Sequence, residues 1–561
     1  MTVEEARKAA ARALRDPWAA PIRETVVGAV ADRATAAPDA IAIVDASGAL
    51  PYRQLVAQVT AVTGWLLGRG CRPGDVVGVL GPRAAESVLV YLALENIGAV
   101  YLPIDPDWPS SRTRLVMHRS GVRHVVDHRR HPGPDRPVTN MPQPVVHVLS
   151  NLPSPPASVF RSVRPVRRSC EDAAGAELRC VLHTSGSTGE PKGVLLEHRG
   201  VVGHLWAKVR ELELTAADTV AFTAPPGFVV SLFQMLAALV VGGTVAILDS
   251  GSVAFPRRLL AQVHARSVSV LELVPTLIDR VAADIESGTS AATLPCLRWI
   301  VSTGEELHPR IAQRILHALP HVRLLNSYGL TETSDDVAHM RVHNPPGSQH
   351  RLALGHPIAN ASLYVLVQHE AVWRAAADNE PGELFVGGGP VCRGYLDDDA
   401  TAAAFFQDVF DPLSPTGRLY RTGDRARVHA GQLHYLGRHD RQVQIAGVRT
   451  EPVEIEIVLD RHPDIHRSTV ASTSGTPAAL VAFYIPVSTP PTSASLAAYA
   501  RAALPQALVP HLWVPVATFP TNSNGKIDHR ALASRADELL RETNRAPGTP
   551  IPCAKPRHRD S

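Results

Sequence analysis

Residues suited to phosphate chemistry gather between Val181 and Gly193. The segment reads VLHTSGSTGEPKG, so a strand-like apolar start runs into a series of small or hydroxylated residues before the lysine. Small side chains let backbone N–H groups converge on an anion, and Ser and Thr hydroxyls add further donors. The pattern therefore predicts a phosphate-binding loop, whose candidate residues are Thr184, Ser185, Gly186, Ser187, Thr188, Gly189 and Lys192.

Two other interpretations of this segment fit its residues less well. It is not the GxxxxGK[ST] loop, because Lys192 lies three residues past Gly189 and is followed by Gly193 rather than Ser or Thr. A flexible Ser/Gly linker is the second possibility, and such linkers rarely follow a strand directly and close on a Pro-Lys-Gly turn. The phosphate-binding interpretation is therefore favoured.

Further motifs surround this loop in a fixed order. They are Gly98–Pro106 (GAVYLPIDP), Asn326–Thr333 (NSYGLTET), Gly382–Leu384 (GEL), Tyr420–Asp424 (YRTGD), Gly437–Val443 (GRHDRQV) and Asn524–Asp528 (NGKID). With the loop, they resemble the superfamily of acyl- and aryl-CoA synthetases, nonribosomal peptide synthetase adenylation domains and firefly luciferase. The resemblance covers nearly the whole chain and is closest to a stand-alone peptide synthetase adenylation domain. It implies an ATP-dependent acid–thiol ligase that forms an acyl-AMP.

The resemblance also implies a nucleotide site. Adenylation joins two anions, so its catalysis must be largely positional and electrostatic. Asn326 would hydrogen-bond adenine, Tyr328 would pack on its face, and Asp424 would accept the ribose hydroxyls. Arg438 would steady ribose and phosphate. The expected ATP-binding set outside the loop is Gly304, Asn326, Tyr328, Asp424, Tyr435 and Arg438.

The expected catalytic residues are Thr331, Glu332 and Lys526. By resemblance, Thr331 contacts the α-phosphate and Glu332 holds Mg²⁺, a hard cation suited to carboxylate oxygens. Lys526 would bridge the substrate carboxylate and the α-phosphate. Asp440 resembles the family hinge, about which a small domain rotates before the thiol attacks.

The acid-binding pocket is predicted by counting from the motifs. Its expected wall is Val229, Val230, Phe233, Glu272, Val301, Thr303, Ser327, Asp335 and Asp336. Relatives that activate α-amino acids carry Asp at the position of Val229, where it pairs with the α-ammonium. The substrate is therefore expected to lack an α-amine in the usual place.

Three carboxylates in one pocket create an electrostatic problem. Two such charges 4 Å apart repel by about 4 kcal/mol at an effective dielectric constant near 20, so they protonate or require a cation. We therefore expect a basic acid, such as β-lysine or an ω-amino or ω-guanidino acid. The alternative stays open that Asp335 or Asp336 caps a helix or faces solvent, or that Glu272, at a strand end, does not line the pocket.

Elements that position these residues follow an α/β rhythm. Apolar strands alternate with Ala/Leu-rich helices, for example a strand over 76–80 and a helix over 84–97, which predicts βαβ units. The expected fold is α/β, with a large N-terminal domain of stacked mixed sheets over 1–439. A small mobile α+β domain follows over 440–535 and carries the catalytic lysine, and 536–561 is expected to be a disordered tail.

Composition excludes several classes of function. The 561 residues carry a formal charge of +3, with 45% hydrophobic residues, which is ordinary for a globular protein and unlike a nucleic-acid binder. Six scattered cysteines without a CxxC pair argue against a zinc site or a disulfide framework. The sequence has neither a signal peptide pattern nor an apolar run of membrane length. A cytoplasmic enzyme is therefore expected, with no membrane partner.

The motifs leave the acyl acceptor and the partners open. No carrier-protein motif follows Lys526, so a carrier protein in trans is expected, with a small helper protein as a further candidate partner. The chain departs from the family pattern at Gln444, Ala446 and 452–453, near the expected thioester-forming face. Alternatives are therefore an aryl- or acyl-CoA ligase and a carrier-independent amide-forming ligase. A catalytically silent homologue is disfavoured because the motif residues are intact.

Overall fold

The structure is a computed structural model. It describes residues 12–16, 18, 21–129, 145–149, 175–186, 190–288, 294–345, 351–369, 372–438, 440–445, 447–475, 478–521 and 527–545. By its internal contacts the chain divides into two compact units. The first takes residues up to 106, 114–183 and 193–439, and the second takes 107–113, 184–192 and 440 onward.

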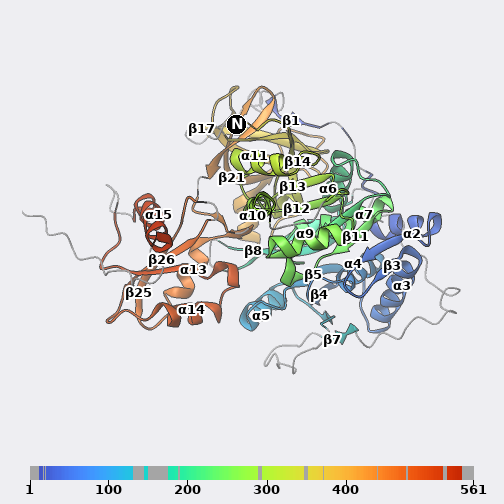
Figure 1. Ribbon diagram of the computed structural model, residues 1–561, viewed down its shortest axis with the longest axis horizontal. Coiled ribbons are helices and arrows are strands. Elements are labelled where there is room, and N and C mark those ends of the chain that lie inside the picture. Colours follow the sequence, from blue (N-terminus) through green and yellow to red (C-terminus); the bar gives the residue numbers. More distant parts are fainter. Residues whose placement is uncertain are drawn as a thin grey trace, which may run out of the picture. The chain divides into compact units, whose positions relative to one another are not determined.

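A large mixed sheet dominates the first unit (Figure 1). Its strands, in spatial order, are β1 (Leu14–Arg15), β17 (Ala361–His369), β19 (Gly382–Gly388), β21 (Arg418–His429), β22 (Gln432–Arg438), β16 (Ala353–Pro357), β15 (Asp335–Val342), β14 (Arg323–Leu330), β13 (Trp299–Ser302), β12 (Val270–Leu273), β10 (Thr219–Phe222), β11 (Thr244–Ile247), β2 (Ile41–Val44) and β3 (Ala49–Pro51). Outside this order, β18 (Val372–Ala375) pairs with β17, and β20 (Phe405–Gln407) pairs with β21.

A second sheet of the first unit follows the predicted βαβ pattern. Its order is β7 (Val145–Val148), β6 (His124–Asp127), β4 (Val76–Leu80), β5 (Val100–Ile104), β8 (Leu178–Thr184) and β9 (Lys192–Glu197). Strand β4 pairs in parallel with β5 and β6, and helix α4 (Ala85–Ile97) connects β4 to β5. The predicted strand over 76–80 and the helix that follows it are thus confirmed, as is the α/β fold class.

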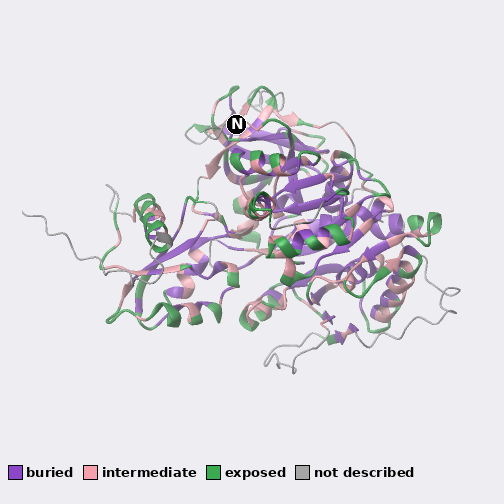
Figure 2. Ribbon diagram, in the orientation of Figure 1, coloured by how far each residue is buried: buried purple, intermediate pink, exposed green. Residues whose placement is uncertain are grey.

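Helices join and cover these sheets. They are α2 (Val26–Ala36), α3 (Tyr52–Gly68), α5 (Ser110–Arg119), α6 (His198–Glu211), α7 (Val230–Val241), α8 (Ser250–Val253), α9 (Pro256–Ala265), α10 (Pro275–Glu286), α11 (Pro309–Ala318) and α12 (Asp398–Ala404). Most of α7 is buried, and β12 and β13 are buried along their whole length (Figure 2). The centre of the unit is therefore an apolar core, in which any charged group needs a partner.

The second unit has its own small core. Strands β23 (Val443–Ile445) and β24 (Val448–Thr450) form a hairpin, and β25 (Ile465–Ser472), β26 (Leu480–Pro486) and β27 (Leu512–Pro515) form a three-stranded sheet. Its helices are α13 (Pro452–Leu459), α14 (Ser493–Arg501) and α15 (His529–Arg545). The α+β class predicted for this part is what these elements show.

The predicted tail needs one correction. Helix α15 continues to Arg545, because Leu532, Ala536 and Leu539 lie on one face and pack with Phe483 in a buried cluster. The tail expected from 536 therefore starts no earlier than 546, and 546–561 lie outside the described residues. Among the described helices, none is both long and apolar enough to cross a membrane.

Candidate active site

Parallel strands bring several predicted site residues to one edge of the large sheet. Strands β12, β13 and β14 pair in register, with Glu272 opposite Val301 and Ser302 opposite Asn326. Thr303 and Gly304 come directly after β13. Carboxyl ends of neighbouring parallel strands are where α/β sheets place their ligands. This edge therefore carries one part of the nucleotide set and one part of the pocket set.

Tyr328, Asp424 and Arg438 form one hydrogen-bonded group. Arg438 Nη1 donates to Asp424 Oδ1 at 2.6 Å, across the register pair that joins β21 and β22. The Tyr328 hydroxyl donates to Asp424 Oδ2. Burial and the neighbouring Asp424 hold the pKa of Tyr328 well above its ordinary value, so the phenol stays neutral and remains a donor. The structure thus brings together three residues predicted for ribose and adenine.

The other nucleotide candidates outside the phosphate loop also belong to the first unit. Asn326 Nδ2 donates to the Ala353 carbonyl at 3.2 Å, which fixes the orientation of the Asn326 side-chain amide. Burial, and then Asp424, raise the pKa of Tyr435. Gly304 has φ +78°, a conformation that favours glycine.

Thr331 and Glu332 form a short 3₁₀ turn directly after β14. The Glu332 carboxylate is buried and accepts a hydrogen bond from the Tyr395 hydroxyl at 2.7 Å. Its carbonyl accepts from the Cys392 N–H at 3.0 Å, which holds the turn in place. A buried carboxylate oriented by such contacts is the ligand type that Mg²⁺ prefers, so Glu332 fits its predicted role.

Four of the acid-pocket candidates meet in a buried charged cluster. Glu272 lies on β12, Asp335 and Asp336 open β15, and Phe233 lies on α7. Asp335 is 3% exposed and Asp336 is 0% exposed, which rules out a solvent-facing role for either. The other pocket candidates are Val229 and Val230 at the start of α7, Val301 and Thr303 at β13, and Ser327 on β14.

Two residues that the sequence patterns did not single out complete this cluster. Lys208 on α6 lies with its Nζ 2.9 Å from Asp336 Oδ2, forms an ion pair with Glu272, and sits 4.2 Å from the centre of the Phe233 ring. His204, one turn earlier, places Nε2 3.3 Å from Asp335 Oδ2 and 3.5 Å from Asp336 Oδ2. The expectation that the three carboxylates depend on a substrate cation was therefore incomplete, because the chain itself supplies one.

An unusual backbone turn brings Asp335 and Asp336 to the same place. Successive side chains of a strand normally point to opposite faces, but Asp335 has φ +103° and Ser334 has φ +59°. Gly329 makes room for this turn, since a Cβ there would lie 2.0 Å from the Asp335 carbonyl oxygen. Such conformations cost about 1–3 kcal/mol each and concentrate at functional sites.

Electrostatics set the charge of the cluster near neutral pH. Burial, then Asp336, raise the pKa of Asp335, which favours its neutral form. Burial acts against ionisation of Asp336, but Lys208, His204 and others outweigh it and hold its pKa well below the ordinary value. Burial raises the pKa of Glu272, partly offset by Lys208.

The two bases of the cluster differ in charge. Burial lowers the pKa of His204 to about 4, so its imidazole is neutral at pH 7. For Lys208, burial is outweighed by Asp336 and Glu272, which raise its pKa and keep it charged. Lys208 and the neutral His204 thus face three carboxyl groups, so the cluster becomes negatively charged when more than one of these carboxyl groups is ionised.

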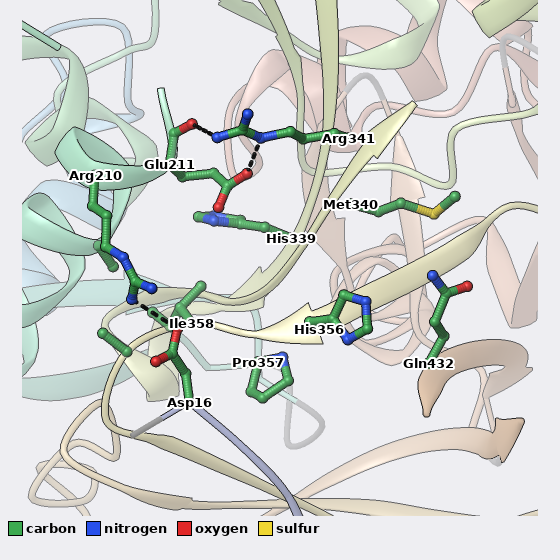
Figure 3. Close-up of a pocket in the computed structure, with 12 residues that line it drawn as sticks. Asp16, Arg210, Glu211, His339, Met340, Arg341, His356, Pro357, Ile358 and Gln432 are labelled. Atoms are coloured by element: carbon green, nitrogen blue, oxygen red, sulfur yellow. Dashed lines mark hydrogen bonds and ion pairs between the residues drawn. The ribbon is translucent and has the colours of Figure 1, made fainter. Parts of the chain in front are cut away.

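His339 connects this cluster to an outer pocket. Its Nε2 lies 3.0 Å from Asp336 Oδ2, and the residue also lines a pocket of about 350 Å³ (Figure 3). Charged groups around that pocket pair with one another, Arg210 with Asp16 at 2.9 Å and Arg341 Nε with Glu211 at 2.7 Å. The outer pocket therefore adds no strong net charge.

A metal ion is a further occupant to weigh for the cluster. His204, Asp335 and Asp336 each offer one ligand atom, and these atoms lie within 4.8 Å of one another. The Lys208 ammonium, 2.9 Å from Asp336, would repel a second cation at that position. The cluster therefore fits a metal less well than it fits the lysine already there.

The phosphate loop belongs to the second unit. Ser185 Oγ donates to the Arg449 carbonyl at 2.8 Å, and a Cβ at Gly186 would lie 1.9 Å from the Glu190 carbonyl oxygen. Thr184 ends β8 and Lys192 begins β9. Ser187, Thr188, Gly189 and Lys526 lie outside the described residues. Asp440, the predicted hinge, accepts from the Gln442 N–H at 3.2 Å.

Comparison with known proteins decides the family. The sequence pattern of the AMP-binding enzymes matches residues 30–396, which is more than half of the chain. The chain belongs to the AMP-binding enzyme family. Solved structures that contain adenylation domains are similar to it, and this AMP-binding enzyme is an ATP-dependent, AMP-forming ligase.

Peptide synthetases are prominent among the relatives of this AMP-binding enzyme. It is 34% identical over 527 residues to phosphinothricin tripeptide synthetase PhsB of Streptomyces viridochromogenes, covering 91% of this chain and 42% of PhsB. It is 32% identical over 543 residues to the probable non-canonical nonribosomal peptide synthetase CymA of Salinispora arenicola, covering 95% of this chain and 7% of CymA. The chain spans between 7% and 45% of the length of such curated relatives.

Solved structures agree with the fold. Holo-PA1221, a nonribosomal peptide synthetase protein containing adenylation and PCP domains, is 26% identical with a TM-score of 0.77, covering 91% of this chain and 84% of that chain. IdnL1 is 23% identical with a TM-score of 0.72, covering 89% of this chain and 99% of that chain, and supports the fold alone.

Proposed function

We propose that this enzyme adenylates a carboxylic acid bearing a cationic group remote from its carboxylate. The observation that carries this proposal is the buried cluster of Glu272, Asp335, Asp336 and Lys208, which has three acids and one charged base and becomes negatively charged when a second carboxyl group ionises. An acid with an ammonium or guanidinium group would neutralise it. β-Lysine and ω-amino or ω-guanidino acids have this chemistry.

Asp335 is the carboxylate that would recognise the cation. Lys208 already pairs with Glu272 and Asp336. Asp335 Oδ2 is buried and, within the described residues, accepts no hydrogen bond of good geometry. A cationic group nearby would ionise it and gain a charge-assisted hydrogen bond of roughly 1.5–3 kcal/mol. Val229, which cannot pair with an ammonium, supports the absence of a conventionally held α-amine.

The nucleotide would bind along the strand ends of the first unit. In this proposal Asn326 and Tyr328 hold adenine, Asp424 and Arg438 hold ribose, and Glu332 holds Mg²⁺. The metal would supply positive charge at the phosphates as the acyl-AMP forms. Lys526 would bridge carboxylate and α-phosphate, and the second unit would move about Asp440 between the two half-reactions.

The acyl group would then pass to the phosphopantetheine thiol of a carrier protein in trans. Support comes from holo-PA1221, which is 26% identical to this chain and contains both adenylation and PCP domains. Mass spectrometry of a phosphopantetheinylated carrier, incubated with enzyme, ATP and acid, should show the thioester. Efficient transfer to free CoA, with the carrier left unloaded, would instead identify a CoA ligase.

Pyrophosphate exchange across a panel of acids tests the substrate proposal. The panel holds β-lysine, 4-guanidinobutyrate, lysine, arginine, leucine and an aryl acid, with Asp335→Asn alongside the wild type. We expect the cationic acids to exceed leucine by about ten- to hundredfold, since each 1.4 kcal/mol is about tenfold. Asp335→Asn should remove most of that preference. A preference for leucine or the aryl acid, unaffected by the substitution, would overturn the cationic assignment and leave adenylation standing.

A further inference from the structure

The Lys208 side chain ends among predicted acid-pocket residues rather than at the surface. It enters from α6, is 0% exposed, and places its ammonium against Phe233, Glu272 and Asp336, three members of the predicted pocket wall. Its neighbours Val201, Val202 and Leu205 on α6 belong to the apolar core. A lysine on an otherwise core-facing helix is thus directed at the carboxylates of this pocket.

The surroundings of the Lys208 Nζ have the composition of an ammonium-binding site. Two carboxylates approach it, one at 2.9 Å from Asp336, and the aromatic face of Phe233 lies 4.2 Å away. Carboxylate pairs and aromatic faces are the groups that recognise alkylammonium ions. Gln234 adds an amide that donates to Glu272 Oε2 at 3.3 Å, so the second oxygen of that carboxylate is also held.

We propose that Lys208 is a specificity-determining residue, whose ammonium occupies an alkylammonium subsite in the wall of the acid pocket and so limits the length of acid accepted. The proposal rests on the proposed function, because it refines the substrate class of the same pocket. A substrate cation is directed to Asp335, since the position between Glu272 and Asp336 is filled. A shorter side chain at 208 would free that position for an ammonium from outside.

Substitution of Lys208 by alanine tests this directly. Alanine keeps the Cβ and removes three methylenes and the ammonium, so n-propylammonium has the shape of the missing part. Lys208→Met is the matched control, because methionine fills the stem but brings no charge. Thermal unfolding is measured for wild type, Lys208→Ala and Lys208→Met with n-propylammonium chloride, and with sodium chloride and 1-propanol as references.

We expect n-propylammonium to raise the melting temperature of Lys208→Ala by several degrees more than it raises those of the wild type and Lys208→Met. Propanol and sodium chloride should not reproduce the effect, and adding Glu272→Gln should weaken it. If Lys208→Ala is recovered unfolded, refolding with and without n-propylammonium replaces the melting assay, and folded protein is expected only with the amine. The same melting temperature, or the same yield of refolded protein, with and without n-propylammonium would overturn the proposal.

Pyrophosphate exchange tests the effect on substrate length. The ratio of exchange rates for 7-aminoheptanoate over 4-aminobutyrate should be at least tenfold higher in Lys208→Ala than in wild type or Lys208→Met. An unchanged ratio would refute the role of Lys208 in specificity. Failure of the wild type to activate any cationic acid would instead count against the proposed substrate class, while the n-propylammonium measurement still decides whether the subsite exists.

Discussion

Replacing Lys208 by methionine removes the one lysine or arginine that the described residues place among the three acids of the cluster. At 2.9 Å and an effective dielectric constant near 20, its attraction to Asp336 alone is about 6 kcal/mol. Desolvation of the ammonium offsets part of this, and breaking a buried ion pair typically costs about 3–5 kcal/mol. We therefore expect Lys208→Met to lower the free energy of unfolding of the first unit by about 3–5 kcal/mol at pH 7.5.

The pH dependence of this penalty has a definite sign. Without Lys208, burial leaves Glu272 and Asp336 with pKa values raised above those of the unfolded chain. Such groups destabilise the fold at pH values above their folded pKa, and less so as the pH falls through it. The difference between variant and wild type should therefore shrink from pH 8 toward pH 5.

Urea denaturation at several pH values measures the effect, followed by tryptophan fluorescence, to which the buried Trp299 of the first unit contributes. Arg535→Met is the control, because Arg535 pairs with Glu538 at an exposed site, where an ion pair contributes little. A penalty below about 1 kcal/mol for Lys208→Met, or one that grows as the pH falls, would refute this account of the cluster.

Three further predictions concern catalysis and the pocket turn. Lys526→Ala should reduce acid-dependent pyrophosphate exchange at least about a hundredfold with nearly unchanged ATP binding, because the lysine acts on the transition state; near wild-type exchange would exclude that role. Tyr328→Phe removes the donor to Asp424 and should raise the KM for ATP about tenfold, measured by pyrophosphate exchange at saturating acid. An unchanged KM would show that the Tyr328–Asp424 pair does not take part in ATP binding. Gly329→Ala should lower the melting temperature and reduce the discrimination among acids in the exchange assay, because the added Cβ would collide with the Asp335 carbonyl. A variant with unaltered stability and acid preference would contradict the close packing at Gly329.

Motif spacing predicted much of the site, because strands and turns of fixed length separate the residues involved. Tyr328 lies 96 residues before Asp424 in the sequence, and the two meet with Arg438 in one hydrogen-bonded group. Counting from the motifs places Asp335 and Asp336 in one pocket, although alternation along a strand would separate them. The positive φ of Asp335 resolves that conflict, and no pattern in the sequence indicates it.

Lys208 and His204 could not be predicted in the same way. On a helix with this mixture of residues, charged side chains are normally assigned to the solvated face. Only the packing of α6 against the sheet shows that both are buried. The one feature of the sequence that could have indicated a buried base was the presence of three acids in the predicted pocket, because a base of the chain itself could balance their charge.

In the proposed function, the β14–β15 hairpin would contact both reactants through one short piece of backbone. Asn326 and Tyr328 would contact the nucleotide, and a few residues later the turn at Gly329 and Asp335 would shape the acid pocket. Engineering a new acid preference through this hairpin would therefore disturb ATP binding at the same time. Helix α7, which contributes Val230 and Phe233 and carries none of the predicted nucleotide residues, is the better place to retarget the enzyme.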